Sequence, residues 1–377
     1  MKKNLWMLGM AVAALTSCTQ SEVMDIPESR AISFGTFVDK ASRVTDELVN
    51  DITAGTINQF NVLGYNATYK ANGGYTSDDF TCIFNDVPVT KGTNGWTYTD
   101  TQYWHTGKLY RFAAYSDGQK STSTLENSTI DVVYNPVSAE GAPDNIVFNN
   151  YESDGTKDLV AAISGDVSTN QGKPTGPVNF DFQHMLAKIV FDFAATSAVD
   201  NSQVGISDIV LSNIATDGTG IMKYVSGRNT VDWTEGTQNY QYEPQESFKL
   251  AAPVNSELKS EYIVFYVIPQ ALKAATSTTT DGVVTSVPGS QVSFKVANYL
   301  SGSNTPVNNE YHNHTFDLIV GDNNSWEPGL VYHYTLRFGS EADIVPIQFG
   351  VSSVSIWPAG DGGSISLLAP GIAHTEE

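Results

Sequence analysis

The chain has 377 residues and a formal net charge of −21, from 41 acidic and 20 basic side chains. A chain of this length can form two or three domains with hydrophobic cores, which excludes a small disulfide-stapled scaffold. The acidic surplus repels polyanions and so excludes DNA and RNA as partners. Hydrophobic residues make up 41% and charged residues 16%, and glycine, serine, threonine, tyrosine and valine are abundant. This composition predicts an ordered all-β protein.

The first residues are typical of an export signal. Two lysines precede an uncharged apolar run that ends at Leu15 and is too short to span a bilayer. The run leads into Leu15-Thr16-Ser17-Cys18, the pattern of a bacterial lipobox, in which small residues admit the peptidase and the cysteine thiol accepts lipid. We predict a lipoprotein signal peptide over residues 1–17 and lipid on Cys18. The alternative is ordinary signal cleavage beside an unrelated cysteine.

Cys82 is the second of two cysteines in the chain. If Cys18 carries lipid, Cys82 has no partner, and no disulfide holds the fold despite an oxidising compartment. Cys82 lies between Phe80 and Phe84 in a mostly apolar segment. We therefore predict that it is a small residue of the hydrophobic core.

The folded part is predicted to begin near Ala31, after a polar tether. Residues 31–38 alternate apolar and small polar side chains, which predicts a strand. Residues 39–47 are polar, lack periodicity and contain Arg43, which predicts a loop. A second alternation over residues 57–65 predicts the next strand. Two predicted strands therefore flank one arginine-bearing loop.

The rest of the chain consists of short apolar alternations separated by clusters of glycine, asparagine, aspartate and proline, which are hairpin and loop signals. Their spacing is typical of β-sandwiches. Pro174 and Pro177 divide two sets of strands, which predicts an N-terminal sandwich over residues 44–177 and a C-terminal one over residues 178–377. The main strand candidates are residues 110–115, 186–193, 208–211, 262–268, 292–296, 332–338 and 347–356.

Several segments, in this order and spacing, resemble the fimbrillins of the Bacteroidales, pilin-like lipoproteins related to the major and minor fimbrial subunits of type V pili. The resemblance implies two transthyretin-like β-sandwich domains in tandem and a structural or adhesive subunit of a cell-surface fimbria, with no enzymatic activity. It is carried by the lipobox, the strand over 31–38, Tyr98-Thr99-Asp100-Thr101-Gln102-Tyr103-Trp104, Tyr110-Arg111-Phe112-Ala113-Ala114-Tyr115, Asp158-Leu159-Val160-Ala161-Ala162, Phe182-Gln183-His184-Met185-Leu186-Ala187-Lys188-Ile189, Trp326-Glu327-Pro328-Gly329 and Tyr332-His333-Tyr334-Thr335-Leu336.

The resemblance also implies a route of assembly. An arginine-specific, gingipain-like protease cuts the exported precursor after its first strand, and the vacated groove accepts a strand from another subunit. Residues 18–43 are then a lipid tether plus a removable first strand, and cleavage after Arg43 leaves Val44 as the new N-terminus. Arg43 is the only one of the five arginines that lies between two N-terminal strand candidates. Cleavage after Arg30 is the alternative, and it would release the lipid tether without opening a groove.

The donor strand is expected near the C-terminus, after the flexible Asp361-Gly362-Gly363. The predicted donor segment alternates apolar and polar side chains, as a strand inserted into a groove must. The alternative is that the C-terminal runs simply complete the second sandwich. The segment consists of Ser364, Ile365, Ser366, Leu367 and Leu368.

The partners implied by the resemblance are other copies of the chain or related pilus subunits, the protease, the outer membrane through the lipid of the precursor, and a host glycan or protein receptor. Two alternatives remain at this point. The chain can be a tip or anchor subunit that keeps its first strand, or a non-polymerising surface lipoprotein that binds glycans. Aromatic side chains for stacking on sugars, if they are exposed rather than packed in the core, are Tyr98, Tyr103, Trp104 and His105, or Trp233 with Tyr240 and Tyr242.

No motif predicts catalysis, a cofactor or a metal site. His312-Asn313-His314 would place two imidazoles on one face of a strand, but only Glu310 or Asp317 offers a third ligand nearby, so two polar strand residues are the better interpretation. His184 is expected to hydrogen-bond backbone at a domain junction. Nucleophile elbows and phosphate-binding glycine loops are absent from the sequence.

Overall fold

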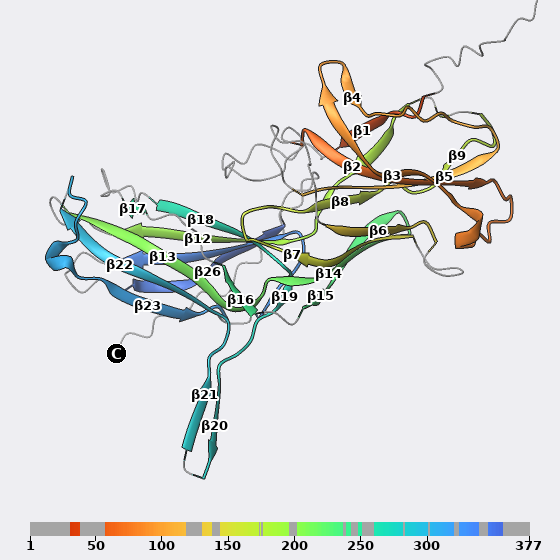
Figure 1. The fold of residues 1–377 in the computed structure, drawn as a ribbon. Helices are drawn as coiled ribbons and strands as arrows, with labels where there is room; N and C mark the ends of the chain where they lie inside the picture. The colour runs from red at the N-terminus through yellow and green to blue at the C-terminus, as the bar shows by residue number, and fades with distance from the viewer. Residues whose placement is uncertain are drawn as a thin grey trace, which may run out of the picture.

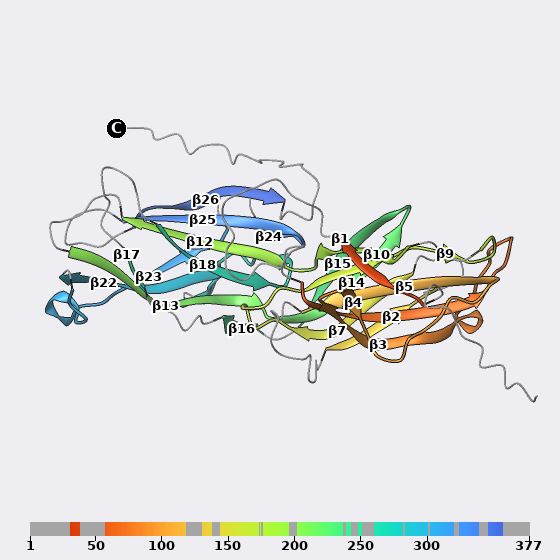
Figure 2. The same cartoon turned by 90° about the horizontal axis from the view of Figure 1, so that it is seen from above.

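The computed structural model describes fourteen stretches of the chain. In these stretches the protein is all-β, as predicted, with two short 3-10 turns, η2 (Ser77–Asp79) and η3 (Val307–Asn309). Among these residues no helix is long and apolar enough to cross a membrane. Figures 1 and 2 show two groups of sheets lying end to end in an elongated molecule. The described residues are 31–37, 57–117, 130–137, 144–172, 174, 176–195, 202–236, 239–242, 248–250, 260–281, 283–300, 302–319, 324–338 and 346–356.

The largest sheet of the first group has the strand order β11-β8-β5-β2-β3-β4, with β9 also paired to β5. Its central strand β5 contains the predicted segment Tyr110-Arg111-Phe112-Ala113-Ala114-Tyr115. This segment is mostly apolar on both faces, and both faces are buried. Its strands are β2 (Gln59–Thr68), β3 (Thr81–Gly92), β4 (Gly95–Thr97), β5 (Lys108–Ser116), β8 (Val160–Ile163), β9 (Val167–Ser168) and β11 (Gln183–His184).

Two smaller sheets lie on either side of this large sheet. One is a parallel pair of β1 (Phe34–Phe37) and β10 (Val178–Asp181). The other is antiparallel, with the order β15-β14-β7-β6. Its strands are β6 (Asp131–Asn135), β7 (Asn145–Glu152), β14 (Asp217–Val225) and β15 (Arg228–Glu235).

The second group is a sandwich of two sheets, with the orders β18-β12-β25-β26 and β16-β13-β22-β23, β17 pairing with β13 beside β16. All seven main strand candidates coincide with observed strands. Five lie inside a strand: 110–115 in β5, 208–211 in β13, 292–296 in β22, 332–338 in β25 and 347–356 in β26. The other two overlap one: 186–193 overlaps β12, and 262–268 overlaps β18. The strands are β12 (Ala187–Ala195), β13 (Ser202–Ala215), β16 (Asn239–Tyr242), β17 (Phe248–Leu250), β18 (Ser260–Val267), β22 (Gln291–Leu300), β23 (His312–Asp317), β25 (Leu330–Phe338) and β26 (Pro346–Ile356).

Two further strand pairs complete the described fold. The short pair of β19 (Gln270–Ala271) and β24 (Ser325–Trp326) closes one end of the second sandwich. The hairpin of β20 (Thr276–Thr280) and β21 (Val283–Val287) pairs with no third strand among the described residues and projects from the body as a separate arm (Figure 1).

Three buried apolar clusters hold these layers together. The first fills the second sandwich, where aromatic side chains of β12 and β25 meet β13 and β22. The second lies between the large sheet and the β1–β10 pair. The third lies between the opposite face of the large sheet and the β15-β14-β7-β6 sheet, and it also includes Leu186, Val190, Tyr266 and Val331 from the second group. The third cluster therefore joins the two groups of sheets through one continuous packed region.

Strands from the second half of the chain complete the first group of sheets. β14 pairs with β7 from Asp217↔Glu152 to Lys223↔Asn145, so the hairpin of β14 and β15 belongs to a sheet of the first group. β10 and Phe182, which follow Pro177, contribute to the cluster beneath β1. Strands that follow the predicted boundary after Pro177 therefore belong to the first group of sheets.

The prediction for Cys82 is wrong, because its side chain is exposed. In the pairing of β2 with β3, Gly64 faces Phe84 and Tyr65 faces Cys82, so Ile83 is an extra residue on β3. A bulge of this kind reverses the alternation of faces along a strand. Phe84 therefore points into the second cluster, while Cys82 lies beside Tyr65 on the opposite face of the sheet and is exposed there.

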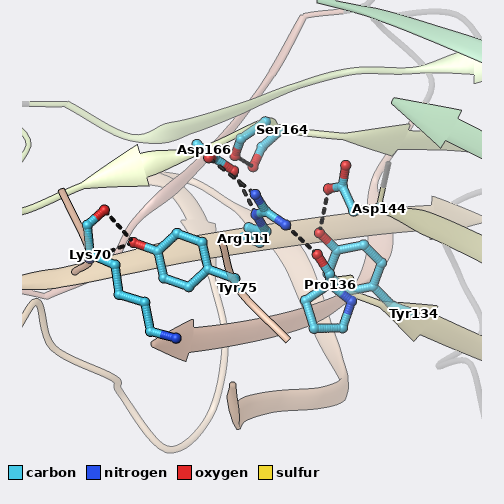
Figure 3. A network of polar contacts seen from close by, with 9 residues as sticks. Lys70, Tyr75, Arg111, Tyr134, Pro136, Asp144, Ser164 and Asp166 are labelled. Atoms are coloured by element: carbon cyan, nitrogen blue, oxygen red, sulfur yellow. Dashed lines mark hydrogen bonds and ion pairs between the residues drawn. The ribbon is translucent and has the colours of Figure 1, made fainter. Parts of the chain in front are cut away.

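A polar network around Arg111 clamps the large sheet to the β6 strand (Figure 3). The Arg111 guanidinium makes two bonds to Asp166, Nε to Oδ1 at 2.6 Å and Nη2 to Oδ2 at 3.2 Å, and also donates to the Pro136 carbonyl. Next to it the Tyr134 hydroxyl donates to Oδ2 of Asp144 at 2.8 Å, and both side chains are buried. Burial raises the pKa of the Asp144 carboxyl, and it raises the pKa of Tyr134 well above its usual value.

Asp144→Asn should change the pH dependence of stability. Because the pKa of Asp144 is higher in the folded than in the unfolded chain, ionisation of this carboxyl costs the native state free energy. The cost is absent below about pH 4, where the carboxyl is protonated in the unfolded chain as well, and it grows as the pH rises. The unfolding free energy of Asp144→Asn relative to the wild type should therefore increase between about pH 3.5 and pH 6 in urea titrations.

Asp131→Asn is the matched control, since Asp131 is an exposed aspartate of β6, the strand that carries Tyr134. Its unfolding free energy should follow that of the wild type across the same pH range. A constant difference between Asp144→Asn and the wild type would contradict this account of the Asp144 carboxyl.

Candidate functional site: the groove that holds strand β1

Strand β1 lies at the rim of the first group of sheets, beside β10 (Figure 2). The two run parallel, with Phe34 opposite Val178 and Phe37 opposite Asp181. In the described part of the chain β10 is the only strand with a ladder to β1. Because one side of a four-residue strand supplies all of its ladder hydrogen bonds, β1 is held by its side chains as much as by its backbone.

Three hydrogen bonds fix the backbone just before β1. The Ile32 amide donates to the Gln102 carbonyl at 2.8 Å, and the Val178 amide donates to the Ser33 carbonyl at 2.8 Å. The Tyr98 hydroxyl donates to the Ile32 carbonyl at 2.7 Å. The segment therefore enters the groove in a single register.

Phe34 is the main side-chain anchor of β1. Only 5% of its surface is exposed, and Ile32 is buried beside it. Edge-to-face, tilted and stacked contacts of this kind are the favourable geometries for aromatic pairs. The Phe34 ring centroid lies 5.3 Å from Phe84, 5.5 Å from Tyr98, 5.8 Å from Phe180, 5.9 Å from Phe112 and 6.5 Å from Phe60.

Gly35 lets the strand approach β10 closely. A Cβ atom at this position would lie 2.6 Å from Oδ1 of Asn179 and 3.4 Å from Cγ of Pro177. A larger residue here would push β1 away from β10 or displace the Asn179 side chain. The groove thus accepts a large apolar residue followed directly by a very small one.

The groove has an aromatic floor, which we define as Phe60, Phe84, Tyr98, Phe112 and Phe180. These residues come from β2, β3, the β4–β5 connection, β5 and β10. The sequence predicted that residues 31–38 form a strand in need of a sheet, but not which strand they join. No local signal identifies β10 as the partner, because the two strands are far apart in the chain.

The predicted processing and lipidation residues lie outside the described residues. This applies to Cys18, Arg30, Arg43 and Val44, and also to the predicted donor segment 364–368. These predictions therefore stay predictions. The structure places only the strand that precedes Arg43 and the strand β2 that follows it.

The other three arginines all lie in paired strands. Arg111 of β5 pairs with Tyr65 of β2, and its guanidinium is held by Asp166. Arg337 pairs on both sides, with Ala194 of β12 and Gln348 of β26. Arg228 follows the β14–β15 turn and pairs with Val225. Proteases cut most readily at exposed, unpaired chain, which disfavours Arg111 and Arg337. Arg228 is exposed beside its turn and is disfavoured by its pairing alone.

Among the aromatic candidates for glycan binding that are described with side chains, Tyr103 is half-buried and His105 is exposed, and the other three are packed. Trp104 is a buried member of the cluster beneath β1, and Tyr98 packs against it. Trp233 packs partly buried against the third cluster and donates its indole N–H to the Met185 carbonyl at 2.6 Å. These side chains support the core, as expected for aromatic residues of a sandwich, rather than forming an exposed platform.

The histidine candidates also form structural contacts. The His314 ring is tilted against Phe294 and stacked on Phe316, with ring centroids 5.7 Å and 6.4 Å away. No group of three metal-ligating side chains is found among the described residues. His184 lies in the junction, where its Nδ1 is 2.8 Å from Oδ2 of Asp158 and both side chains are buried. Its partner is thus a carboxylate, which the sequence analysis did not predict.

Comparison with known proteins identifies the family. Residues 42–357 match the model of the fimbrillin-like family. That match covers most of the chain, so the protein belongs to the fimbrillin-like family. No curated protein matches the chain significantly.

Solved structures of Bacteroides proteins are also similar to the chain. A fimbrial protein from Bacteroides vulgatus is 14% identical, with a TM-score of 0.48, and the match covers 87% of this chain and 99% of that one. A candidate cell adhesion protein from Bacteroides uniformis is 16% identical, with a TM-score of 0.38 and the same coverage. Another from Bacteroides ovatus is 14% identical, with a TM-score of 0.39, covering 85% of this chain and 96% of that one.

Replacing Phe34 should destabilise the uncut protein. Phe34→Ala removes the ring that contacts the aromatic floor. Truncation of a buried phenylalanine to alanine typically lowers the free energy of unfolding by about 3–5 kcal/mol. Urea denaturation followed by tryptophan fluorescence should show a loss of unfolding free energy in that range. The neighbouring Ser33→Ala alters an exposed side chain and should change it by less than about 0.5 kcal/mol. Equal effects of the two substitutions would contradict the role of Phe34 as an anchor.

Proposed function

We propose that this protein is a structural subunit of a cell-surface fimbria that polymerises by strand exchange. In this proposal it is exported as a lipoprotein with lipid on Cys18 and anchored in the outer membrane, and an arginine-specific protease cuts after Arg43. The cut frees β1, and a strand from another subunit takes its place. The observation that carries the proposal is the way β1 is held: a short strand with one ladder partner covers a preformed aromatic floor.

Loss of β1 has a free-energy cost that favours refilling of the groove. Burial of a side chain such as Ile32 or Phe34 is worth about 1.5–3 kcal/mol each. The free edge of β10 would also lose backbone hydrogen bonds to β1, including the one from Val178 to Ser33. An incoming strand restores both the apolar burial and the backbone hydrogen bonds to β10. It therefore binds through the same interactions that hold β1.

Residues 364–368 share the order of large and small side chains seen in β1, with serine in place of glycine. The groove takes a large apolar residue followed by a very small one, as in Phe34-Gly35. In the predicted donor segment Ile365 is followed by Ser366, and Leu367 continues the apolar alternation. With Ile365 in the place of Phe34, Ser366 comes opposite Asn179, and its Cβ requires the exposed Asn179 side chain to move aside.

The pairing of the other arginines supports Arg43 as the processing site. Arg111, Arg228 and Arg337 are all in paired strands. Cleavage after Arg30 would leave Ile32 and Phe34 on the subunit and keep the groove filled. Cleavage after Arg43 is therefore the cut that both detaches the lipid and opens the groove.

The partners in this proposal are further copies of the chain or related fimbrial subunits, with the protease acting during maturation. A host glycan or protein receptor would be contacted by the assembled fimbria. A subunit that keeps β1 would serve instead as a tip or anchor. The experiment that follows separates these roles.

Digestion of residues 19–377 with an arginine-specific protease should give one major product that begins at Val44. N-terminal masses read the cut, while size exclusion and negative-stain microscopy read the assembly. After cutting, ladders and filaments should form. Arg43→Ala should abolish both the cut and the filaments, whereas Arg30→Ala should leave both intact.

A competing peptide tests the groove itself. A synthetic peptide of residues 31–38 added in excess should suppress filament growth, because it refills the groove, and the same peptide with Phe34→Ala should be at least tenfold less potent. Cleavage only after Arg30, or a cut at Arg43 that leaves a stable monomer, would overturn the polymerising role and favour a tip, anchor or glycan-binding lipoprotein.

A further inference from the structure

The arm formed by β20 and β21 is the most exposed apolar feature of the described chain. All ten strand residues of the arm are exposed. Val283, Val284 and Val287 are 66%, 63% and 58% exposed, and they account for three of the eight exposed large hydrophobic side chains among the described residues. Figure 1 shows the arm extending away from both groups of sheets. Such a concentration of exposed valines marks an interaction surface.

The arm is fixed at its base, and along its length no strand of the described part of the chain pairs with it. At the base the Ser290 amide donates to the Lys273 carbonyl at 2.8 Å, and the Lys273 amide donates to Oγ of Ser290 at 2.9 Å. Asn213 adds a bond from Nδ2 to the Gly289 carbonyl at 2.8 Å. An isolated two-stranded hairpin is only marginally stable in water, and a third strand or a packed face is normally needed. The base therefore fixes the direction of the arm, and pairing with a further strand would stabilise it.

The charge of the arm differs from that of the rest of the chain. Between Thr276 and Val287 the only charged residue is Asp281 in the turn, whereas the whole chain carries −21. Five residues of strand reach about 17 Å, which exceeds the Debye length of about 8 Å at physiological ionic strength. Two copies that meet through their arms thus avoid much of the repulsion between their acidic bodies.

The sequence of β21 is complementary to itself. Val283, Thr285 and Val287 lie on one face of the arm, because side chains alternate along a strand. If two β21 strands pair antiparallel about Thr285, Val283 of each copy faces Val287 of the other. β20 offers only threonine and serine at its edge, so β21 is the better edge for this contact.

We propose that β21 pairs with β21 of a second copy of this chain across a two-fold axis. The result is a four-stranded sheet with the order β20-β21-β21-β20, centred on Thr285. One face of that sheet carries four valines flanked by threonines, which gives the arm the width and apolar face that it lacks alone. A contact of this kind is isologous and closes as a dimer, so it is a lateral link and is independent of strand exchange through the β1 groove.

The first test measures self-association of uncut residues 19–377 by sedimentation equilibrium. A monomer–dimer equilibrium should appear, and it should tighten when the salt is raised from about 20 to 300 mM, because salt screens the acidic bodies. Val283→Lys with Val287→Lys should weaken dimerisation at least tenfold. The matched control is Ser277→Lys with Thr279→Lys, which adds the same charge on the outer strand and the opposite face and should change the dissociation constant less than threefold.

A disulfide trap tests the register in a background of Cys82→Ser, because Cys82 is free and exposed. Thr285→Cys lies on the proposed axis and should give a covalent dimer under mild oxidation. Thr278→Cys, its partner within the hairpin, would be three strand spacings, about 14 Å, from its counterpart, too far for a disulfide. A monomer at all concentrations, open-ended aggregates, or equal cross-linking of the two cysteine variants would overturn the proposal.

Discussion

Strand β5 has both faces buried, and much of the architecture depends on that constraint. Tyr110 and Phe112 point into the cluster beneath β1, while Ala113 and Tyr115 point into the cluster that joins the two groups of sheets. A strand that serves two cores must be apolar throughout, and its only polar side chain in mid-strand, Arg111, is accommodated by Asp166 and the Pro136 carbonyl. The strand therefore couples the groove on one side to the interior of the molecule on the other.

This coupling explains how the groove can keep its shape without β1. Two residues of the floor, Phe60 and Phe112, belong to β2 and β5, which are paired along eight residue positions. The opposite face of the same sheet is packed against β7 and β14 through Phe148 and Met222. Because the opposite face of the large sheet is packed, removal of the four-residue strand β1 leaves most of the packing around Phe60 and Phe112 in place. If β1 leaves as proposed, a groove supported in this way would bind a replacement strand with little cost of reorganisation.

Local sequence predicted which segments are strands far better than it predicted their partners. The alternation over residues 31–38 and 110–115 was sufficient for β1 and β5, since side-chain period is a local property. The parallel pairing of β1 with β10 depends on packing between segments that are distant in the chain. The extra residue Ile83 shows a second limit, because one bulge reversed the expected burial of Cys82. The arm of β20 and β21 was missed because its threonine-rich sequence carries no signal of burial.

The return of the β14–β15 hairpin to the first group of sheets has a consequence for the order of folding. The sheet β15-β14-β7-β6 is incomplete until Glu235 is available, although β6 and β7 precede it by many residues. As the chain is made from its N-terminus, β7 therefore keeps an open edge over the 64 residues between Glu152, where β7 ends, and Asp217, where β14 begins. Such long-range closure is slow and leaves an adhesive edge exposed in the meantime. Until β14 arrives, this edge of β7 is open to pairing with any other extended chain.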